Sequence, residues 1–195
     1  MPPKAKFTRD EILDMAFYIT KEYGIDAVTA RELGARLGSS ARPIFTIFES
    51  MDEVKESVII KSKELYGQYV EKGLKSQLAF KGVGIAYIRF AIEQPKLFQL
   101  LFMRPTQEPT DVSMILPVID DNYEKILQSV QEPYCLERKA AERLYQHLWT
   151  YTHGIATMFA TGLCSYTMEQ LEERLTDVFK GLLLVEKGRD RNDKN

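Results

Sequence analysis

Apolar positions recur along nearly the whole chain at steps of three and four residues, which is the spacing of one face of an α-helix. Strict alternation of apolar and polar residues over the length of a strand is absent from the sequence. The Asn-Gly and Asp-Gly pairs of tight hairpins are absent as well. The pattern predicts an all-α protein of about nine helices.

Helix starts are marked by four Ser/Thr-x-x-Glu/Gln sequences, at Thr8–Glu11, Thr29–Glu32, Ser50–Glu53 and Thr167–Gln170. In such a capping box the hydroxyl accepts a hydrogen bond from a free backbone N–H near the helix start. The side chain three residues later accepts one from the N–H of the cap itself. Each of the four precedes a helical apolar pattern, so we expect a helix to begin directly after each.

The starts and the Gly and Pro stops together define the expected elements. We expect helices over residues 9–23, 30–37, 41–48, 51–73, 77–93, 95–103, 111–131, 136–163 and 168–187. The helix over 111–131 should bend at Pro117, because proline lacks the N–H that the helix needs. The first three helices should form a small bundle over residues 1–50. Residues 51–195 should form a larger helical domain.

The two short helices over 30–37 and 41–48 are joined by the tight turn Leu37-Gly38-Ser39-Ser40, which is typical of a helix-turn-helix. In that motif the second helix enters the major groove of DNA with its N-terminal residues nearest the bases. Those residues are Ser40, Ala41, Arg42, Pro43 and Thr46.

Arg42 can bind guanine or a phosphate through two hydrogen bonds. Thr29 and Ala30, at the start of the preceding helix, offer a hydroxyl and free N–H groups to a phosphate. A helical hairpin that packs and does nothing else has the same spacing, so the spacing alone leaves both interpretations open.

Composition adds no sign of nucleic-acid binding. The 195 residues are 45% hydrophobic and 28% charged, with a net charge of −2, as in an ordinary protein with a buried core. Residues 1–63 contain ten basic and ten acidic side chains, so this segment is neutral. Any contact with DNA therefore depends on where the charges lie.

Several classes of location and chemistry are not expected. No apolar run approaches the ~18 residues of a membrane span, and no apolar segment follows the first lysines. We expect a cytoplasmic protein with Cys135 and Cys164 reduced and no membrane partner. His147 and His153 lie six residues apart on one helix, so they cannot share a metal ion. With no phosphate loop or dinucleotide fingerprint either, we expect no enzyme, no metal and no cofactor.

Two groups of apolar residues are candidates for binding. The first group consists of aromatic and Met side chains, with the polar groups of Tyr, Trp and His among them. Such side chains form either ordinary hydrophobic core or the wall of an apolar cavity that has a few polar groups. The candidates for a ligand cavity are Tyr87, Phe90, Phe98, Phe102, Trp149, His153 and Met158.

The last helix carries the second group, an apolar stripe at steps of three and four. With the helix expected over 136–163, the stripe predicts a symmetric homodimer interface in which the last two helices of each chain form a four-helix contact. Its candidates are Leu171, Leu175, Val178, Phe179 and Leu182. A monomer whose final helix is enclosed by its own chain is the alternative.

The N-terminal segment also resembles a known family. The stretch TRDEILDMAFYITKEYGIDAVTARELGARLGSSARPIFTIFESMDEV is similar to the DNA-binding domain of the tetracycline-repressor (TetR) family of transcriptional regulators. The shared features are a first helix that ends in Gly, a T-x-x-x-[L/I]-[A/G] second helix, a Gly turn and an aromatic pair ahead of acidic residues. AIEQPKLFQLLFM at 91–103, followed by Trp149-x-x-x-His153-Gly154, resembles the C-terminal domain type named for a Trp-His-Gly signature.

This resemblance implies a ligand-responsive repressor that binds a palindromic operator in double-stranded DNA as a homodimer. It further implies that a small-molecule inducer binds the C-terminal domain. The residues placed against DNA would be Lys6, Thr29, Ala30, Arg31, Ser40, Ala41, Arg42, Pro43, Phe45, Thr46 and Lys55.

Three positions depart from the family pattern. Phe45 replaces a Tyr, Ile47 replaces a His and Met51 replaces a Lys, and each change removes a contact to the DNA backbone. We expect Lys4, Lys6, Arg9 and Lys55 to compensate, since phosphate contacts dominate affinity. A helical sensor or interaction protein that has lost operator binding remains the alternative.

Overall fold

The computed structural model describes residues 6–105 and 111–192. In this part of the chain it contains nine α-helices, two short 3-10 helices and no strand. The prediction of an all-α protein is therefore confirmed. The chain divides into two compact units. The N-terminal unit comprises Met1–Leu65 and Gln94–Arg104, and the C-terminal unit comprises Tyr66–Glu93 and Pro105–Asn195.

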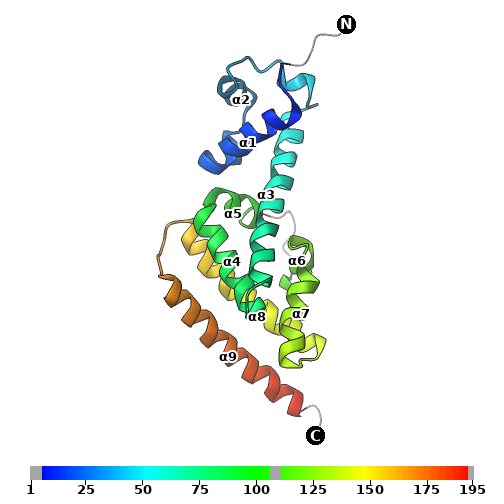
Figure 1. The fold of residues 1–195 in the computed structure, drawn as a ribbon, viewed down its shortest axis with the longest axis vertical. Helices are drawn as coiled ribbons and strands as arrows, with labels where there is room; N and C mark the ends of the chain where they lie inside the picture. Colours follow the sequence, from blue (N-terminus) through cyan, green and yellow to red (C-terminus); the bar gives the residue numbers. More distant parts are fainter. Residues whose placement is uncertain (1–5, 106–110, 193–195) are drawn as a thin grey trace. The chain divides into compact units, whose positions relative to one another are not determined.

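The N-terminal unit is a small helical body built on α1 (Figure 1). Its elements are α1 (Arg9–Tyr23), η1 (Ile25–Ala27), α2 (Ala30–Arg36), η2 (Ile44–Thr46), the first part of α3 (Met51–Leu74) and α5 (Pro95–Phe102). Helix α1 packs against α2 and α5. The buried core consists of Ile12, Ala16, Ile19, Val28, Leu33, Ile44, Phe48, Val54, Val58 and Leu100.

The C-terminal unit surrounds the helix α8. Its elements are the rest of α3, α4 (Ala79–Glu93), α6 (Val112–Ile119), α7 (Tyr123–Tyr134), α8 (Arg138–Ala160) and α9 (Met168–Asn192). Helix α8 packs against α4, α6, α7 and α9. Figure 1 shows α9, in orange and red, as the long outer helix of this unit. Among the described helices, none combines the length and apolarity needed to cross a membrane.

The capping sequences mark real helix starts, although two of the four make only half of the expected box. Thr8 and Thr167 make both hydrogen bonds. The hydroxyls of Thr29 and Ser50 accept the N–H of the residue three positions on, at 3.2 Å in each case. The carboxylates of those later residues are engaged elsewhere, in an ion pair with Arg36 and in a hydrogen bond from the N–H of Glu49.

The expected third helix over 41–48 is wrong in its length, because only the single 3-10 turn of η2 forms there. Pro43 has no N–H to donate, and its carbonyl oxygen accepts from both the backbone N–H and the hydroxyl of Thr46. The side-chain hydrogen bond is the shorter, at 2.6 Å. At Ile47 the backbone leaves the helical region, with φ at −124°. Local bonds to Pro43 therefore interrupt the i to i−4 ladder of an α-helix, although the Phe48 N–H still donates to the Ile44 carbonyl at 3.0 Å.

The expected bent helix over 111–131 is in fact two helices. Helix α6 contains Pro117 and continues past it. The helix ends three residues after the proline, at Asp120, whose backbone is extended (φ −130°, ψ 109°). The Asp120 carboxylate accepts the N–H of Asn122 at 2.9 Å. This local turn replaces the helical hydrogen bonds, and α7 then begins at Tyr123.

Candidate functional site

The turn ahead of η2 lies directly against α2. Gly38 adopts a φ of +64°, a left-handed conformation that side chains other than Gly rarely take. A Cβ on Gly34 would lie only 2.9 Å from the backbone carbonyl carbon of Ser40 and 3.0 Å from the N atom of Ala41. Glycine at these two positions therefore lets the helix-turn-helix close tightly.

The side chains that follow this turn are divided between core and surface. Ile44 is fully buried and anchors η2 in the core of the N-terminal unit. Ser40, Arg42, Phe45 and Thr46 are exposed, and the Phe45 side chain is 48% accessible. In the part of the chain that the structure describes, the Arg42 guanidinium makes no ion pair. Arg42 is therefore available to a partner. The other two residues expected against DNA here, Ala41 and Pro43, are half-buried.

Thr29, Ala30 and Arg31 stand at the start of α2. Thr29 and Arg31 are exposed and Ala30 is half-buried. The Thr29 hydroxyl is engaged as the helix cap, where it accepts the N–H of Glu32. Thr29 would therefore offer a partner only the hydrogen of its hydroxyl group.

The basic side chains of this unit differ in how far they are engaged. Lys6 donates to the Ser39 hydroxyl at 3.1 Å and thereby holds the turn. Arg9 pairs with Glu53 at 2.8 Å and lies 4.1 Å above the centre of the Phe48 ring. The Arg9 guanidinium is thus already bound within the protein, while Lys55 is half-buried. Lys4 lies outside the described residues.

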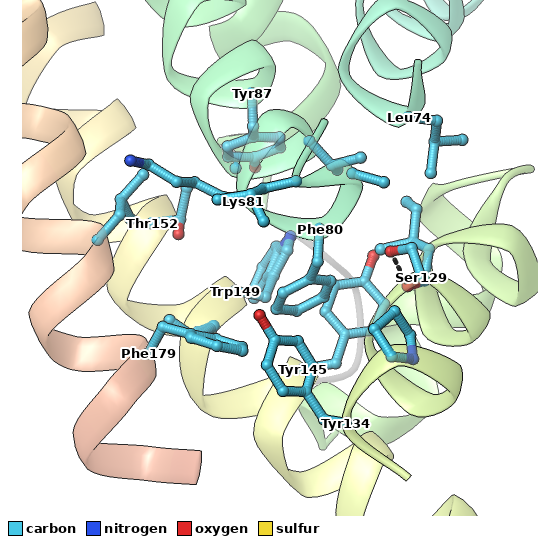
Figure 2. Close-up of a pocket in the computed structure, with 18 of the residues that line it drawn as sticks. Leu74, Phe80, Lys81, Tyr87, Ser129, Tyr134, Tyr145, Trp149, Thr152 and Phe179 are labelled. Atoms are coloured by element: carbon cyan, nitrogen blue, oxygen red, sulfur yellow. Dashed lines mark hydrogen bonds between the residues drawn. The ribbon is translucent and has the colours of Figure 1, made fainter. Parts of the chain in front are cut away.

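The C-terminal unit contains a cavity of about 730 Å³ lined by α4, α7, α8 and α9 together with the end of α3 (Figure 2). This volume is in the range of pockets that hold drug-sized molecules. Figure 2 shows the labelled rings of Phe80, Tyr145, Trp149 and Phe179 gathered around the same space. The other aromatic residues of the wall are Tyr66, Tyr87 and Tyr134.

These rings pack mostly edge to face. The ring centres of Phe80 and Tyr145 lie 5.7 Å apart at an angle of 81°, and those of Tyr134 and Phe179 lie 5.0 Å apart at 60°. Edge-to-face packing is the preferred geometry of aromatic pairs, so it fixes the orientation of the wall.

Two hydrogen bonds, one buried and one partly buried, connect the cavity wall to the helices behind it. The Tyr66 hydroxyl donates to the Asp120 carboxylate at 2.8 Å. The Tyr87 hydroxyl lies 2.9 Å from Nδ1 of His153. Burial raises the pKa of Asp120, Tyr66 and Tyr87 and lowers the pKa of His153. In each case the charged form loses hydration in the interior.

The expected cavity residues are only partly gathered there. Tyr87 and Trp149 line the cavity, whereas His153 stands behind them against the Trp149 ring. Phe90 packs on Tyr66 and Tyr69. Phe98 and Phe102 belong to the N-terminal unit, where their rings pack together at 5.2 Å. Met158 is half-buried further along α8 and is not part of the wall.

Other wall residues were not in the expected set. Tyr145 lies one helical turn before Trp149, and Phe80 lies on the same face of α4 as Tyr87. A search for aromatic residues one or two turns from Tyr87 and Trp149 would have found both. The sequence contained no comparable signal for Tyr134, which stands at the end of α7.

The stripe expected in a dimer interface is partly enclosed by its own chain. Leu171 and Leu175 are buried, and Leu175 and Phe179 line the cavity. Val178 and Leu182 are half-buried. Next along α9, Val185 is 51% accessible. The part of α9 that is free to meet a second copy therefore lies toward its C-terminal end. Within the described residues, no cluster of three His, Cys, Asp or Glu side chains could hold a metal ion.

A comparison with protein families identifies the C-terminal unit. The family described as "Tetracyclin repressor-like, C-terminal domain" matches residues 80–179, which is more than half of the chain. The chain belongs to the tetracycline repressor-like family. The matched residues include α4 from Phe80 onward, all of α8 and most of the cavity wall. A comparison with curated proteins gave no match.

Proposed function

We propose that this protein is a ligand-responsive, DNA-binding transcriptional regulator that acts as a repressor in the cytoplasm. The N-terminal unit binds double-stranded DNA through its helix-turn-helix, and the C-terminal unit binds a small-molecule inducer in the cavity. Membership of the tetracycline repressor-like family is the observation that carries this proposal. The exposed Arg42 beyond a closed turn and the aromatic cavity support its two halves.

The repressor binds a palindromic operator as a homodimer. Each chain carries one helix-turn-helix, so two copies related by a two-fold axis meet two half-sites about one helical turn of DNA apart. The exposed end of α9 around Val185 offers the surface for this contact. Phosphates are bound by the exposed Arg31 and Arg42 and by the half-buried Lys55.

Helix α3 offers a route for the response to the ligand. It contributes Val54 and Val58 to the core of the N-terminal unit, and Tyr66 and Leu74 to the cavity wall. A ligand that fits only one shape of the cavity stabilises the conformation of α3 that has that shape. The two helix-turn-helix motifs of the dimer then no longer match successive major grooves, and DNA is released.

The direct test is a shift assay with the purified protein and the DNA upstream of its own gene. A regulator forms a discrete complex at about 0.1 M salt, and its affinity falls steeply as salt is raised. A complex that forms equally well on unrelated DNA of the same length would contradict operator recognition.

A second function is favoured by three observations in the N-terminal unit. Phe45 and Met51 lack the polar groups that the resemblance leads one to expect, and Arg9 is engaged by Glu53. These features suit a helical sensor or interaction protein that has lost operator binding. Absence of any specific complex in the shift assay, with ligand binding retained, would favour this function over the first.

A further inference from the structure

We propose that the cavity binds an aromatic molecule that carries an oxygen hydrogen-bond acceptor and that is neutral or anionic, not cationic. This inference deepens the proposed function, because it names the chemical class of the inducer. It depends on the ring geometry of the wall, on a row of hydrogen-bond donors along α8 and on the charges around the cavity.

The wall presents aromatic edges and faces to whatever fills the space. Phe80 meets Tyr145 edge to face, and its ring centre lies 6.0 Å from that of Phe179 at an angle of 50°. Tyr87 and Trp149 are tilted by 58° with their centres 6.4 Å apart. A flat ring can pack edge to face or offset against several of these groups at once, whereas a saturated ring has no π face to offer.

Three polar groups stand in a row on one face of α8. Tyr145, Trp149 and Thr152 are separated by four and three residues, so they follow one another along the side of the helix that lines the cavity. Tyr145 and Thr152 are each only 5% accessible. Within the described part of the chain, neither hydroxyl makes a hydrogen bond, and the Trp149 indole N–H makes none either.

The polar atoms of the row are open to the cavity and are not among the fully buried, unpaired atoms of the described chain. Polar groups in a protein interior are normally paired, so a row of free groups that faces a cavity points to a ligand. The indole N–H can only donate, whereas the two hydroxyls can both donate and accept. An oxygen acceptor on the ligand, such as that of a ketone or a carboxylate, satisfies a row of this kind. A hydrocarbon would leave all three groups unsatisfied.

The charges around the cavity favour an anion over a cation. The charged residues of the wall are Lys81, Lys125 and Lys180 against the single exposed Glu132. Lys81 pairs with Glu172 of α9 at 3.2 Å. The buried carboxylate nearest to the wall, Asp120, is not part of the lining and already accepts from Tyr66 and Asn122. A cation in the cavity would meet three lysine ammonium groups against the one carboxylate of Glu132, so the net charge of the wall opposes it.

Isothermal titration calorimetry of the full-length protein without DNA tests this inference with four probes of similar shape. The probes are 2-naphthoate, 2-acetonaphthone, 2-naphthylmethylammonium and decahydronaphthalene-2-carboxylate. We expect one or both of the first two to bind at least about tenfold more tightly than the ammonium and the saturated acid. The chain has a single tryptophan, Trp149, so its emission reports binding at the cavity itself.

Variants of Tyr145 and Thr152 test whether their hydroxyl groups, and not only the shape of the cavity, determine affinity for the probes. Tyr145→Phe and Thr152→Val each remove one hydroxyl, and each is expected to weaken the tighter probe by about fivefold. Tyr166→Phe and Thr157→Val are the matched controls, because both residues lie outside the wall. Their affinities should equal that of the wild type, and circular dichroism confirms that all four variants are folded.

Three results would overturn the inference. These are an ammonium probe that binds as tightly as the naphthoate, a saturated acid that binds equally well, and no binding of any probe at millimolar concentration. The outcome is separate from that of the DNA assay. Naphthoate that binds without releasing DNA counts against the proposed regulation and leaves the ligand class standing.

Discussion

The phenolic oxygen of Tyr87 on α4 and the Nδ1 atom of His153 on α8 lie 2.9 Å apart. The His153 ring also stacks on Trp149, with ring centres 4.8 Å apart and planes inclined by 13°. Burial lowers the pKa of His153, so its neutral form is favoured. A neutral ring with its proton on Nε2 accepts the hydroxyl hydrogen of Tyr87 at Nδ1. This contact supports the cavity wall from behind.

We expect the free energy of unfolding to fall as the pH is lowered from about 7.5 to about 5.5. The unfolded chain binds a proton at His153 near its ordinary pKa of about 6.5, whereas the folded chain resists that proton until lower pH. The contribution of His153 to the free energy of unfolding is therefore complete above about pH 6.5. It is lost as the pH falls from there through the lower pKa of the folded state.

Urea denaturation at a series of pH values measures this effect. His153→Asn does not titrate and keeps an acceptor near the position of Nδ1, so its stability should depend less on pH than that of the wild type. His147→Asn, at an exposed position on the same helix, is the matched control and should follow the wild type. Parallel curves for all three proteins would show that His153 plays no such role.

Tyr66→Phe should destabilise the protein by about 1.5–3 kcal/mol, because it removes the hydroxyl that donates to the buried Asp120 carboxylate. The matched control on the same helix is Tyr69→Phe, whose hydroxyl donates to Glu93 at the surface. Water replaces that bond, so the control should cost less than about 1 kcal/mol. Urea denaturation near pH 7 gives both values. Equal losses would mean that burial of Asp120 does not matter.

Thr157→Val should raise the free energy of unfolding by about 1 kcal/mol. The Thr157 hydroxyl oxygen is the buried side-chain polar atom without a hydrogen-bond partner in the described part of the chain. Valine keeps the branched shape and removes the unsatisfied group, so nothing is lost in packing. Thermal denaturation measures the change as a shift in Tm, with unfolding followed by the α-helical signal in circular dichroism. A lower Tm would indicate that the hydroxyl finds a partner in solution.

Arg42→Ala should weaken binding to the operator by about 1–3 kcal/mol, since the guanidinium is exposed and unpaired within the described residues. A loss concentrated at one or two base pairs indicates contact with guanine, and a uniform loss indicates contact with phosphate. Arg89→Ala removes an exposed arginine of the C-terminal unit and should leave affinity unchanged. If Arg42→Ala binds as well as the wild type, the helix-turn-helix does not carry recognition.

Val185→Glu should convert the dimer to a monomer. An isologous interface contains each residue twice, so one substitution places two unpaired carboxylates in an apolar contact. Sedimentation at micromolar concentration should then give the chain mass of 22.5 kDa. Met114→Glu changes an exposed apolar side chain on α6 and should remain dimeric. A wild-type protein that sediments as a monomer would contradict the proposed homodimer.

Helix positions were predictable because their signals are local. The Thr8 capping box and Gly24 define α1, and the predicted range of 9–23 coincides with Arg9–Tyr23. The hydroxyl and the stop glycine act on backbone groups within four residues, so no tertiary contact is needed to interpret them. The two wrong predictions of helix length also have local causes. They occur at Pro43 and Asp120, where side-chain and carbonyl bonds compete with the helical ladder.

The sequence by itself determined the all-α class, most helix boundaries and the resemblance to a regulator family. Only the tertiary structure decided which aromatic residues share the cavity. Phe98 and Tyr145 have equally plausible helical spacing, yet the first packs in the N-terminal unit and the second lines the cavity. Periodicity identifies the buried face of each helix, but the partner of that face depends on how distant helices pack together. The physical reason is that burial is a property of the assembled helices and not of any one segment.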